Sequence, residues 1–306
     1  MSPDYTAILE TIQAEVQPLL SQGEVASYIP QLSTVSPRHF GMAVYCLDGR
    51  TFSTGDAQQK FSLQSVTKLF ALALAFSREG DAIWSRVGRE PSGNPFNSLV
   101  QLEYERGIPR NPFINAGALV MTDILSTRFV QSDIAVLQFA RSIAGETAID
   151  FDFAVAQSER ETAHRNYAIA HLMKDFGNLH NPVDTVIDSY CRQCSITMTC
   201  AELAKAGSFL AQHGTIPWNG VEILDRSSAK RLNALMLTCG TYDAAGDFAY
   251  KVGLPAKSGV GGGILALVPG ELAVAVWSPG LDATGNSLAG TYALERFTTL
   301  TARSIF

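Results

Sequence analysis

Apolar residues recur at helical spacing near the start of the chain, over residues 5–20. They lie three or four positions apart, as on one face of an amphipathic helix; they are Ile8, Leu9, Ile12, Val16, Leu19 and Leu20. The run FGMAVYC at 40–46 is typical of a strand instead. Asp48-Gly49 is a hairpin turn signal, so we expect 51–54 to form the partner strand. This part of the chain therefore predicts a helix followed by a hairpin.

Helical patterns dominate from about residue 65 to residue 240, interrupted by a loop rich in Pro, Gly and Asn at 90–115. Strand patterns return near the end of the chain, with a Pro-Gly turn before the last of them. The expected strands are 249–252, 257–260, 263–268 and 271–277, and a closing helix covers 288–302.

Both groups of strands lack enough partners of their own, because an isolated hairpin is marginal in water. We therefore expect an α+β fold with one antiparallel sheet built from both chain ends and covered by helices. Residues 1–64 and 225–306 would form this discontinuous sheet domain. Residues 65–224 would form an inserted, mainly helical domain, with the active site between the two.

The composition and charge of the chain argue against one class of function. The chain has 306 residues, with 23 Lys and Arg against 29 Asp and Glu, a net charge of −6. A surplus of acids without a basic cluster argues against nucleic-acid binding. The charged fraction of 17% is low, which suggests that some surface is covered in a homo-oligomer. The charged fraction does not decide between a dimer and a tetramer.

Three further features indicate the cellular compartment. The longest apolar run, 69–76, is far shorter than the ~20 residues that cross a membrane. The first residues carry acids and no basic n-region, so we expect no secretory signal. Five cysteines are an odd number and fit reduced thiols better than a disulfide framework. We expect a cytoplasmic protein with no membrane partner.

The segment 61–70, FSLQSVTKLF, contains the pattern S-x-x-K, formed by Ser65 and Lys68. The apolar run that follows predicts a buried helix with Ser65 in its first turn. Residues three apart share a helix face, so the lysine amine can reach the serine hydroxyl. The helix N-terminus and a dry setting both lower the pKa of the lysine, which can then act as a base towards serine. Alone, the pattern also fits a plain exposed Ser/Lys pair.

A second motif, KSGVGGG at 257–263, precedes a predicted strand. A K-[ST]-G strand edge is the partner of S-x-x-K in the penicillin-recognising serine enzymes. Its small residues let the backbone approach a substrate, and its N–H groups can form half of an oxyanion hole. The glycine spacing fits neither a dinucleotide fingerprint nor a P-loop. An S-D-N motif is absent as written, which weakens the β-lactamase and transpeptidase interpretations.

With these motifs in order, the chain resembles the serine-dependent glutaminases of the β-lactamase-like fold, which hydrolyse L-glutamine to L-glutamate and ammonia. The resemblance runs from about residue 25 to residue 287 and is closest to the compact bacterial-type enzymes. The matching blocks are YIPQL (28–32), FSLQSVTK (61–68), EPSG (90–93), NPFINAGA (111–118), QSERE (157–161), RNYAIA (165–170), CGTYD (239–243) and GLPAKSGVGGG (253–263). The loop at 94–110 matches less closely, so we do not transfer to it the gating role that it has in animal members.

The resemblance implies the catalytic roles. Ser65 would be the nucleophile and Lys68 its base. The backbone N–H groups of Ser65 and Val260 would form the oxyanion hole. The hydroxyls of Tyr28 and Tyr242 would lie close to the serine, and Tyr242 is the better candidate for passing a proton to the leaving ammonia.

The resemblance also implies a substrate-binding set, made of Gln64, Asn115, Glu159, Asn166 and Tyr190. The chemistry agrees, because a glutamine zwitterion needs one anion for its ammonium and neutral donors for its carboxylate. Glu159 is the anion, and Asn166 would share its face if both lay on one helix, seven residues apart.

Each of these binding residues also has a plainer interpretation. Glu159 could form a surface ion pair with the neighbouring Arg160. Asn115 and Asn166 could be helix caps or turn residues. Tyr190 could be an ordinary core residue of a helix.

Other motifs carry weaker chemistry. Cys191 and Cys194 have C-x-x-C spacing, but a helical context favours buried structural thiols over zinc or redox chemistry. His164 and His171 could share a face without an evident third metal ligand. The segment 285–289, GNSLA, approaches a nucleophile elbow but lacks its last glycine, so we expect a helix start there.

We therefore predict a cofactor-free, metal-free amidohydrolase that forms a glutamyl-ester intermediate, with L-glutamine and L-glutamate as its ligands. Two alternatives stay open: an esterase or β-lactamase acting on other acyl groups, and a non-catalytic protein that senses an amino acid. The spacing of the motifs does not decide between glutamine and asparagine, nor does it reveal whether phosphate activates the protein.

Overall fold

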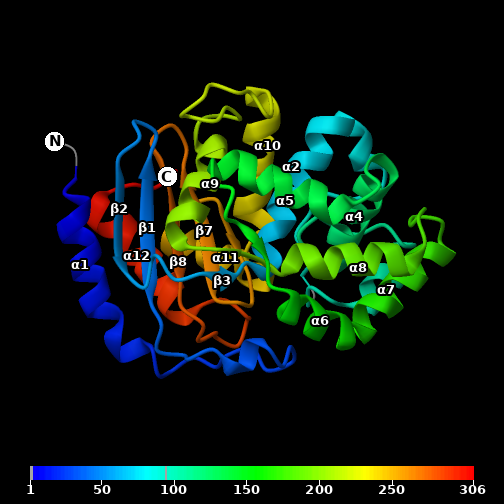
Figure 1. The fold of residues 1–306 in the computed structure, drawn as a ribbon, viewed down its shortest axis with the longest axis horizontal. Coiled ribbons are helices and arrows are strands. Elements are labelled where there is room, and N and C mark those ends of the chain that lie inside the picture. The colour runs from blue at the N-terminus through cyan, green and yellow to red at the C-terminus, as the bar shows by residue number, and fades with distance from the viewer. Residues whose placement is uncertain (1–2, 94) are drawn as a thin grey trace.

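A computed structural model describes residues 3–93 and 95–306, which fold around a five-stranded sheet (Figure 1). The strand order is β2-β1-β8-β7-β6, and every neighbouring pair is antiparallel. The strands are β1 (Gly41–Cys46), β2 (Thr51–Gly55), β6 (Ala256–Ser258), β7 (Gly263–Val268) and β8 (Leu272–Trp277). Because β1 pairs with β8, the two ends of the chain meet in one sheet, which confirms the prediction of a shared antiparallel sheet.

Both faces of this sheet are buried, which explains why its central strands read as continuous apolar runs. Successive side chains of β7 and β8 enter two different hydrophobic clusters. One face packs against α1 (Tyr5–Val16) and α12 (Leu288–Thr301), and the other against α9 (Cys200–Ala211). A Cβ on Gly207 of α9 would lie 2.6 Å from the Leu265 side chain, so the missing side chain lets α9 approach the sheet.

The segment between the two groups of strands is mainly helical. Besides α9, its long helices are α2 (Thr67–Glu79), α4 (Asn115–Arg128), α5 (Ser132–Ala144), α6 (Phe153–Glu161), α7 (His164–Asp175), α8 (Val183–Cys194) and α10 (Arg226–Cys239). Of these helices, α4, α6, α7 and α8 lie to the right of the sheet in Figure 1. Since α9 falls within 65–224 yet packs on the sheet, the division into two domains stays a prediction.

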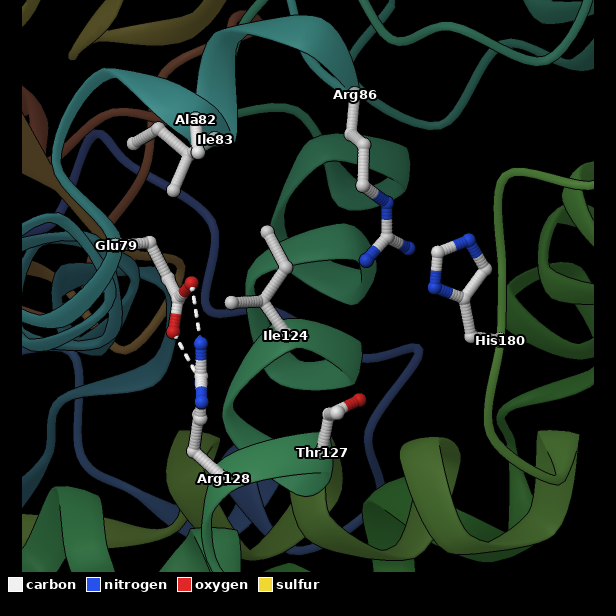
Figure 2. Close-up of a pocket in the computed structure, with 8 residues that line it drawn as sticks. All are labelled: Glu79, Ala82, Ile83, Arg86, Ile124, Thr127, Arg128 and His180. Carbon is white, nitrogen blue, oxygen red and sulfur yellow. Dashed lines mark hydrogen bonds and ion pairs between the residues drawn. The ribbon is translucent and has the colours of Figure 1, made fainter.

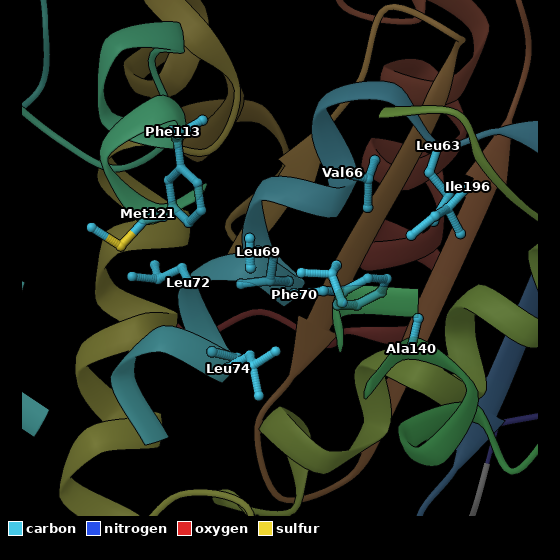
Figure 3. Close-up of a cluster of buried hydrophobic side chains, with 14 of the residues drawn as sticks. Leu63, Val66, Leu69, Phe70, Leu72, Leu74, Phe113, Met121, Ala140 and Ile196 are labelled. Atoms are coloured by element: carbon cyan, nitrogen blue, oxygen red, sulfur yellow. The ribbon is translucent and has the colours of Figure 1, made fainter. Parts of the chain in front are cut away.

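Helix α2 is buried on all sides from Thr67 to Phe76. Figure 3 shows its side chains packed against residues from several other elements, among them Phe113, Met121, Ala140 and Ile196. A helix that is apolar all round belongs in a core. The S-x-x-K segment at its start is therefore attached to a rigid part of the molecule.

The predicted strand at 249–252 is wrong, because these residues end the helix α11 (Ala245–Val252). Its buried side chains are spaced for a helix, and they are Ala245, Phe248 and Val252. Asp247 and Lys251 form an ion pair of 2.8 Å one turn apart on its exposed face. A window of four residues was too short to reveal this period.

The structure also contains short elements that the sequence pattern did not indicate. A second sheet has the order β3-β5-β4, and its strands are β3 (Phe61–Ser62), β5 (Ile196–Met198) and β4 (Asp150–Phe151). A short helix, α3 (Leu99–Tyr104), lies within the expected loop at 90–115. Strands of two or three residues are too short to show an alternating pattern.

All five cysteines are buried and none is in a disulfide, in keeping with the expectation of reduced thiols. Across residues 3–93 and 95–306, none of the helices is both long and apolar enough to cross a membrane.

Candidate active site

Ser65 lies in a single 3-10 turn (Gln64–Val66) that leads directly into α2, one turn earlier than the first turn of the α-helix itself. The residue before it, Gln64, has a φ of 49°, a left-handed conformation that is strained for a side chain. Its side-chain amide donates to the Ser62 hydroxyl at 3.0 Å, and that hydroxyl donates to the Cys194 carbonyl at 3.0 Å. These bonds hold the turn that carries Ser65 in place.

Lys68 is buried beneath this turn, with 2% of its surface exposed. Its Nζ donates to Asn115 Oδ1 at 2.7 Å and to the Phe113 carbonyl at 3.2 Å. Burial lowers the pKa of Lys68 to about 8, although the nearby Glu159 opposes this shift. A substantial fraction of the amine is therefore neutral in mildly alkaline solution and can accept a proton.

Tyr242 brings a phenol to the same place, and its φ of 57° is again strained. Its hydroxyl is within hydrogen-bond reach of the Ser65 side chain and of the Ser258 carbonyl, the latter at 3.5 Å. Burial raises its pKa, so the phenol keeps its proton. The buried Lys257 amine lies 4.6 Å from the ring centroid and donates to the Gly240 carbonyl at 2.8 Å.

A tight turn brings Val260 against the nucleophile segment. The turn is closed by the Gly262 N–H, which donates to the Gly259 carbonyl at 2.9 Å. A Cβ on Gly259 would lie 3.2 Å from the Ser65 backbone nitrogen. A Cβ on Gly261 would lie 2.3 Å from the carbonyl oxygen of Ser62. Two backbones can approach this closely only because glycine lacks a side chain.

Glu159 is the carboxylate of the site and is 8% exposed. Its Oε2 has no hydrogen-bond partner among the residues that the structure describes. Burial raises the pKa of Glu159 to about 7, opposed by a hydrogen bond from Gln64 and by the charge of Lys68. The surface ion pair with Arg160 is wrong, because Arg160 pairs with Asp188 at 2.5 Å.

The expectation that Glu159 and Asn166 share one helix is also wrong. Glu159 is in α6 and Asn166 is in α7, and the helix is broken between them. Both nevertheless line the same cavity.

Asn115 connects the base to this binding region. Its Nδ2 donates to Asn166 Oδ1 at 2.9 Å, while its Oδ1 accepts from Lys68 and lies 3.5 Å from the Tyr190 hydroxyl. Although Asn115 begins α4, its side chain faces these residues instead of capping the helix. Tyr190 is 3% exposed, as in a core, and also lines the cavity.

The cavity gathers eight of the predicted site residues, which are Tyr28, Gln64, Ser65, Asn115, Glu159, Asn166, Tyr190 and Val260. Lys68 and Tyr242 lie against it, through Asn115 and Ser65. Tyr28 is 55% exposed, and burial of its hydroxyl together with the nearby Glu159 carboxylate raises its pKa.

Comparison with known proteins identifies the family. A family model described as Glutaminase matches residues 23–306. The chain belongs to the glutaminase family. A glutaminase of Paraburkholderia phytofirmans is 62% identical over 303 residues, which cover 99% of this chain and 100% of the relative.

Solved structures of the family have the same fold. A probable glutaminase named ybaS matches with a TM-score of 0.92 and 35% identity, covering 98% of each chain. A probable glutaminase from Bacillus subtilis, complexed with 6-diazo-5-oxo-L-norleucine, matches with a TM-score of 0.90 and 32% identity over 100% of this chain and 98% of that one. The fold is therefore the β-lactamase-like fold of the glutaminases, as the resemblance implied.

Sequence reasoning missed several residues that line this family's cavity. Among them are Ile29, Phe96, Asn97, Thr162, Ala163 and Arg165. The Phe96 ring lies 4.9 Å from the Tyr242 ring and 6.0 Å from Lys68 Nζ, so it closes the cavity over the base. An apolar ring in a loop carries no chemical signal in the sequence, and only the fold places it here.

The remaining motifs have structural roles. Cys191 and Cys194 are buried in α8, and burial raises the pKa of both thiols. Within the described part of the chain, no three His, Cys, Asp or Glu residues gather as a metal site requires. Ser287 is the N-cap of α12 and accepts from the Gly290 N–H at 3.1 Å, so 285–289 is a helix start as predicted.

A second pocket lies between the end of α2, α4 and the segment around His180 (Figure 2). Its charged groups are already paired. Arg128 bonds both carboxylate oxygens of Glu79, and Arg86 bonds the fully buried Asp123 at 2.6 Å. Because no nucleophile lies beside a base here, the cavity at Ser65 is the candidate active site of the family fold.

Proposed function

We propose that the chain is a glutaminase that hydrolyses L-glutamine to L-glutamate and ammonia with Ser65 as the nucleophile. One observation carries this proposal. The same cavity holds Ser65, with Lys68 and Tyr242 against it, and the buried carboxylate of Glu159, whose Oε2 has no partner among the described residues. The names of the related proteins agree with this activity.

The amino-acid end of glutamine binds at the acidic side of the cavity. Its ammonium pairs with Glu159 Oε2, which has no partner of its own among the described residues. Such a charge-assisted hydrogen bond is worth about 1.5–3 kcal/mol. The side chains of Asn115, Asn166 and Tyr190 can donate to the carboxylate.

Acylation begins when the neutral amine of Lys68 takes the proton of the Ser65 hydroxyl. The Ser65 oxygen attacks the side-chain amide carbon, and the resulting oxyanion lies between the N–H groups of Ser65 and Val260. Lys68 Nζ bonds Asn115 in the structure, and its four-carbon chain allows it to turn towards a serine one helical turn away.

Tyr242 donates its proton to the departing nitrogen, so that ammonia leaves and the glutamyl ester of Ser65 remains. Water then attacks the ester carbon and passes one proton to the tyrosinate. The ester bond breaks, the serine oxygen regains a proton from Lys68, and L-glutamate is released. Gln64 fixes the turn that carries the nucleophile, and Tyr28 covers the mouth of the cavity.

The test is ammonia release from L-glutamine and from L-asparagine by the purified protein and by Ser65→Ala. We expect the variant to lose several orders of magnitude in kcat. Mass spectrometry after treatment with 6-diazo-5-oxo-L-norleucine should find the adduct on the peptide that contains Ser65. Turnover of nitrocefin or a nitrophenyl ester without glutamine turnover would favour the esterase alternative instead. Binding of glutamate without ammonia release would favour the sensor.

The proposal also includes the arrangement of the two parts of the fold, the cellular compartment and the oligomeric state. The sheet part and the helical part meet at the cavity. The enzyme works in the cytoplasm. It forms a homo-oligomer, since the charged fraction is low and α3 exposes 82% of Val100 and 88% of Tyr104. Light scattering that gives the monomer mass of 32.9 kDa would contradict the last property.

A further inference from the structure

One buried side chain, Trp277, contacts both segments that supply the proposed oxyanion hole. It is the last residue of β8 and is 2% exposed. Its indole N–H donates to the Gly261 carbonyl at 3.0 Å, in the turn that contains Val260. Its ring stacks with Phe61, in the strand that leads to Ser65, with centroids 5.1 Å apart and planes 5° apart.

The hydrogen bond fixes the peptide plane between Gly261 and Gly262, whose N–H closes the turn that contains Val260. Val260 and Gly261 are the two central residues of the turn that Gly259 and Gly262 close. Peptide planes are rigid, so a turn this short has few ways to rotate once one of its carbonyls is fixed. Trp277 fixes that carbonyl from outside the turn.

The stacked rings set the position of the nucleophile strand. The Phe61 ring occupies the space above Gly263, where a Cβ would lie 2.5 Å from the ring. A second ring, that of His39, also stacks on Trp277, at 5.1 Å and 19°. His39 is itself held by Asp56, with Nδ1 and Oδ2 2.8 Å apart. The indole is therefore fixed by its ring faces as well as by its N–H.

We propose that Trp277 is a positioning residue that sets the separation between the Ser65 and Val260 halves of the oxyanion hole. The inference rests on the proposed serine mechanism. Trp277 is not among the residues that line the cavity, so it acts through the turn and the strand and not on the substrate. An oxyanion donor is effective only about 2.7–3.1 Å from the developing charge, so a small shift of either half weakens it.

Ground-state binding depends much less on this separation, because L-glutamate is held by its amino-acid end. The effect should therefore appear in kcat and not in product affinity. In Trp277→Phe, which keeps an aromatic ring but removes the N–H, we expect kcat for glutamine to fall about 10- to 100-fold. The inhibition constant of L-glutamate should stay within about twofold of the parent value.

A sharper variant replaces Trp277 with 3-benzothienylalanine, which keeps the shape of the indole and exchanges only the N–H for sulfur. We expect the same loss of kcat, with a fall in melting temperature no larger than the loss of one buried hydrogen bond causes. Trp218→Phe is the matched control, since Trp218 is a partly buried tryptophan on Tyr45 that is not among the residues lining the cavity. It should leave kcat unchanged.

Three outcomes would overturn the inference: parental kcat in the sulfur analogue, equal losses of kcat and glutamate affinity, or the same loss in Trp218→Phe. If Trp277→Phe does not fold, the sulfur analogue decides. Ser65→Ala is measured alongside. If it keeps activity, the proposed function fails. If it is inactive while the Trp277 variants match the parent, only the role of Trp277 fails.

Discussion

The residues of this site are unusual in what their burial does to their charges. Lys68 is pushed towards its neutral form and Glu159 towards its protonated form, because desolvation disfavours a charge of either sign. A buried amine that is ready to accept a proton and a buried carboxylate with one oxygen unpaired are both costly in an empty core. They are useful where a zwitterion binds beside a serine.

Removing the charge of Glu159 tests the binding of the substrate ammonium. In Glu159→Gln we expect KM for glutamine to rise about 10- to 100-fold, the equivalent of losing a charge-assisted hydrogen bond. Steady-state kinetics of ammonia release measures this. Glu161→Gln is the control, because Glu161 is exposed on the same helix and bonds Gln157. Equal effects in the two variants would remove Glu159 from the binding site.

The pH dependence of kcat/KM follows from the same two groups. Glu159 must be ionised, with a pKa of about 7, and Lys68 must be neutral, with a pKa of about 8, so both act as limits on the acidic side. We expect kcat/KM to rise with pH and to level off only about one pH unit above the pKa of Lys68, because the pH dependence of kcat/KM reflects the ionisable groups of the free enzyme. In Glu159→Gln, one of the two protonation steps that lower kcat/KM at acidic pH should disappear. A rate that falls between pH 6 and 8 would contradict the roles of both groups.

At the scale of elements, the site depends on two backbone segments, the turn at 259–262 and the strand that leads to Ser65, which pack together without side chains between them. Gly261→Ala would place a Cβ 2.3 Å from a backbone oxygen of the nucleophile strand, so the turn must move away. We expect kcat to fall at least about tenfold, as when an oxyanion donor is displaced. Gly246→Ala is the control, since nothing lies within 4 Å of its Cβ. Ammonia-release assays on both variants decide, and full activity in Gly261→Ala would show that the turn is free to shift.

Helix α4 is held at its far end by a buried carboxylate. Asp123 is fully buried and accepts from Arg86 and from the N–H groups of His180 and Asn181. Burial alone would raise its pKa, but these donors outweigh it and lower the pKa. Asp123→Ala removes the carboxylate partner of the largely buried Arg86 guanidinium, which then bonds only Asn178 among the described residues. We therefore expect a loss of about 3–5 kcal/mol in the free energy of unfolding.

Chemical denaturation measures the effect at Asp123. The control is Asp184→Ala, because Asp184 is exposed and its bond to the Tyr167 hydroxyl is at the surface. It should cost at most about 1 kcal/mol. A similar small loss for Asp123→Ala would mean that Arg86 finds solvent or another partner.

For the molecule as a whole, the reactivity of the five cysteine thiols measures how often the buried core opens to solvent. All of them are buried, and burial raises the pKa of each, so neither access nor ionisation favours reaction. We expect a thiol reagent such as Ellman's reagent to label the native protein very slowly and to find all five after denaturation. Rapid labelling of one thiol in the native state would locate a region that opens.

The sequence predicted the structure well where an apolar pattern repeats over a whole helix or strand and where a motif names its reactive residues. The closing sheet strands, the first and last helices and the Ser65–Lys68 pair follow from apolar spacing and from motif order. The helix at 245–252 was missed because its strand-like tail was considered alone. The separate helices of Glu159 and Asn166, the stacked Phe96 and the role suggested for Trp277 depend on tertiary packing, which one sequence does not display.

The pairing of Gly41 with Trp277 joins the two ends of the polypeptide in one sheet. During synthesis on a ribosome, β1 must therefore wait for its central neighbour until β8 (Leu272–Trp277) has been synthesised. The segment with the proposed nucleophile emerges early, whereas the turn with Val260 and the indole that holds it emerge among the last residues. A nascent chain released before residue 277 lacks part of β8, the partner of β1, and the Trp277 indole. One released before residue 260 also lacks the Val260 half of the proposed oxyanion hole. Late stop codons should therefore be as inactivating as early ones.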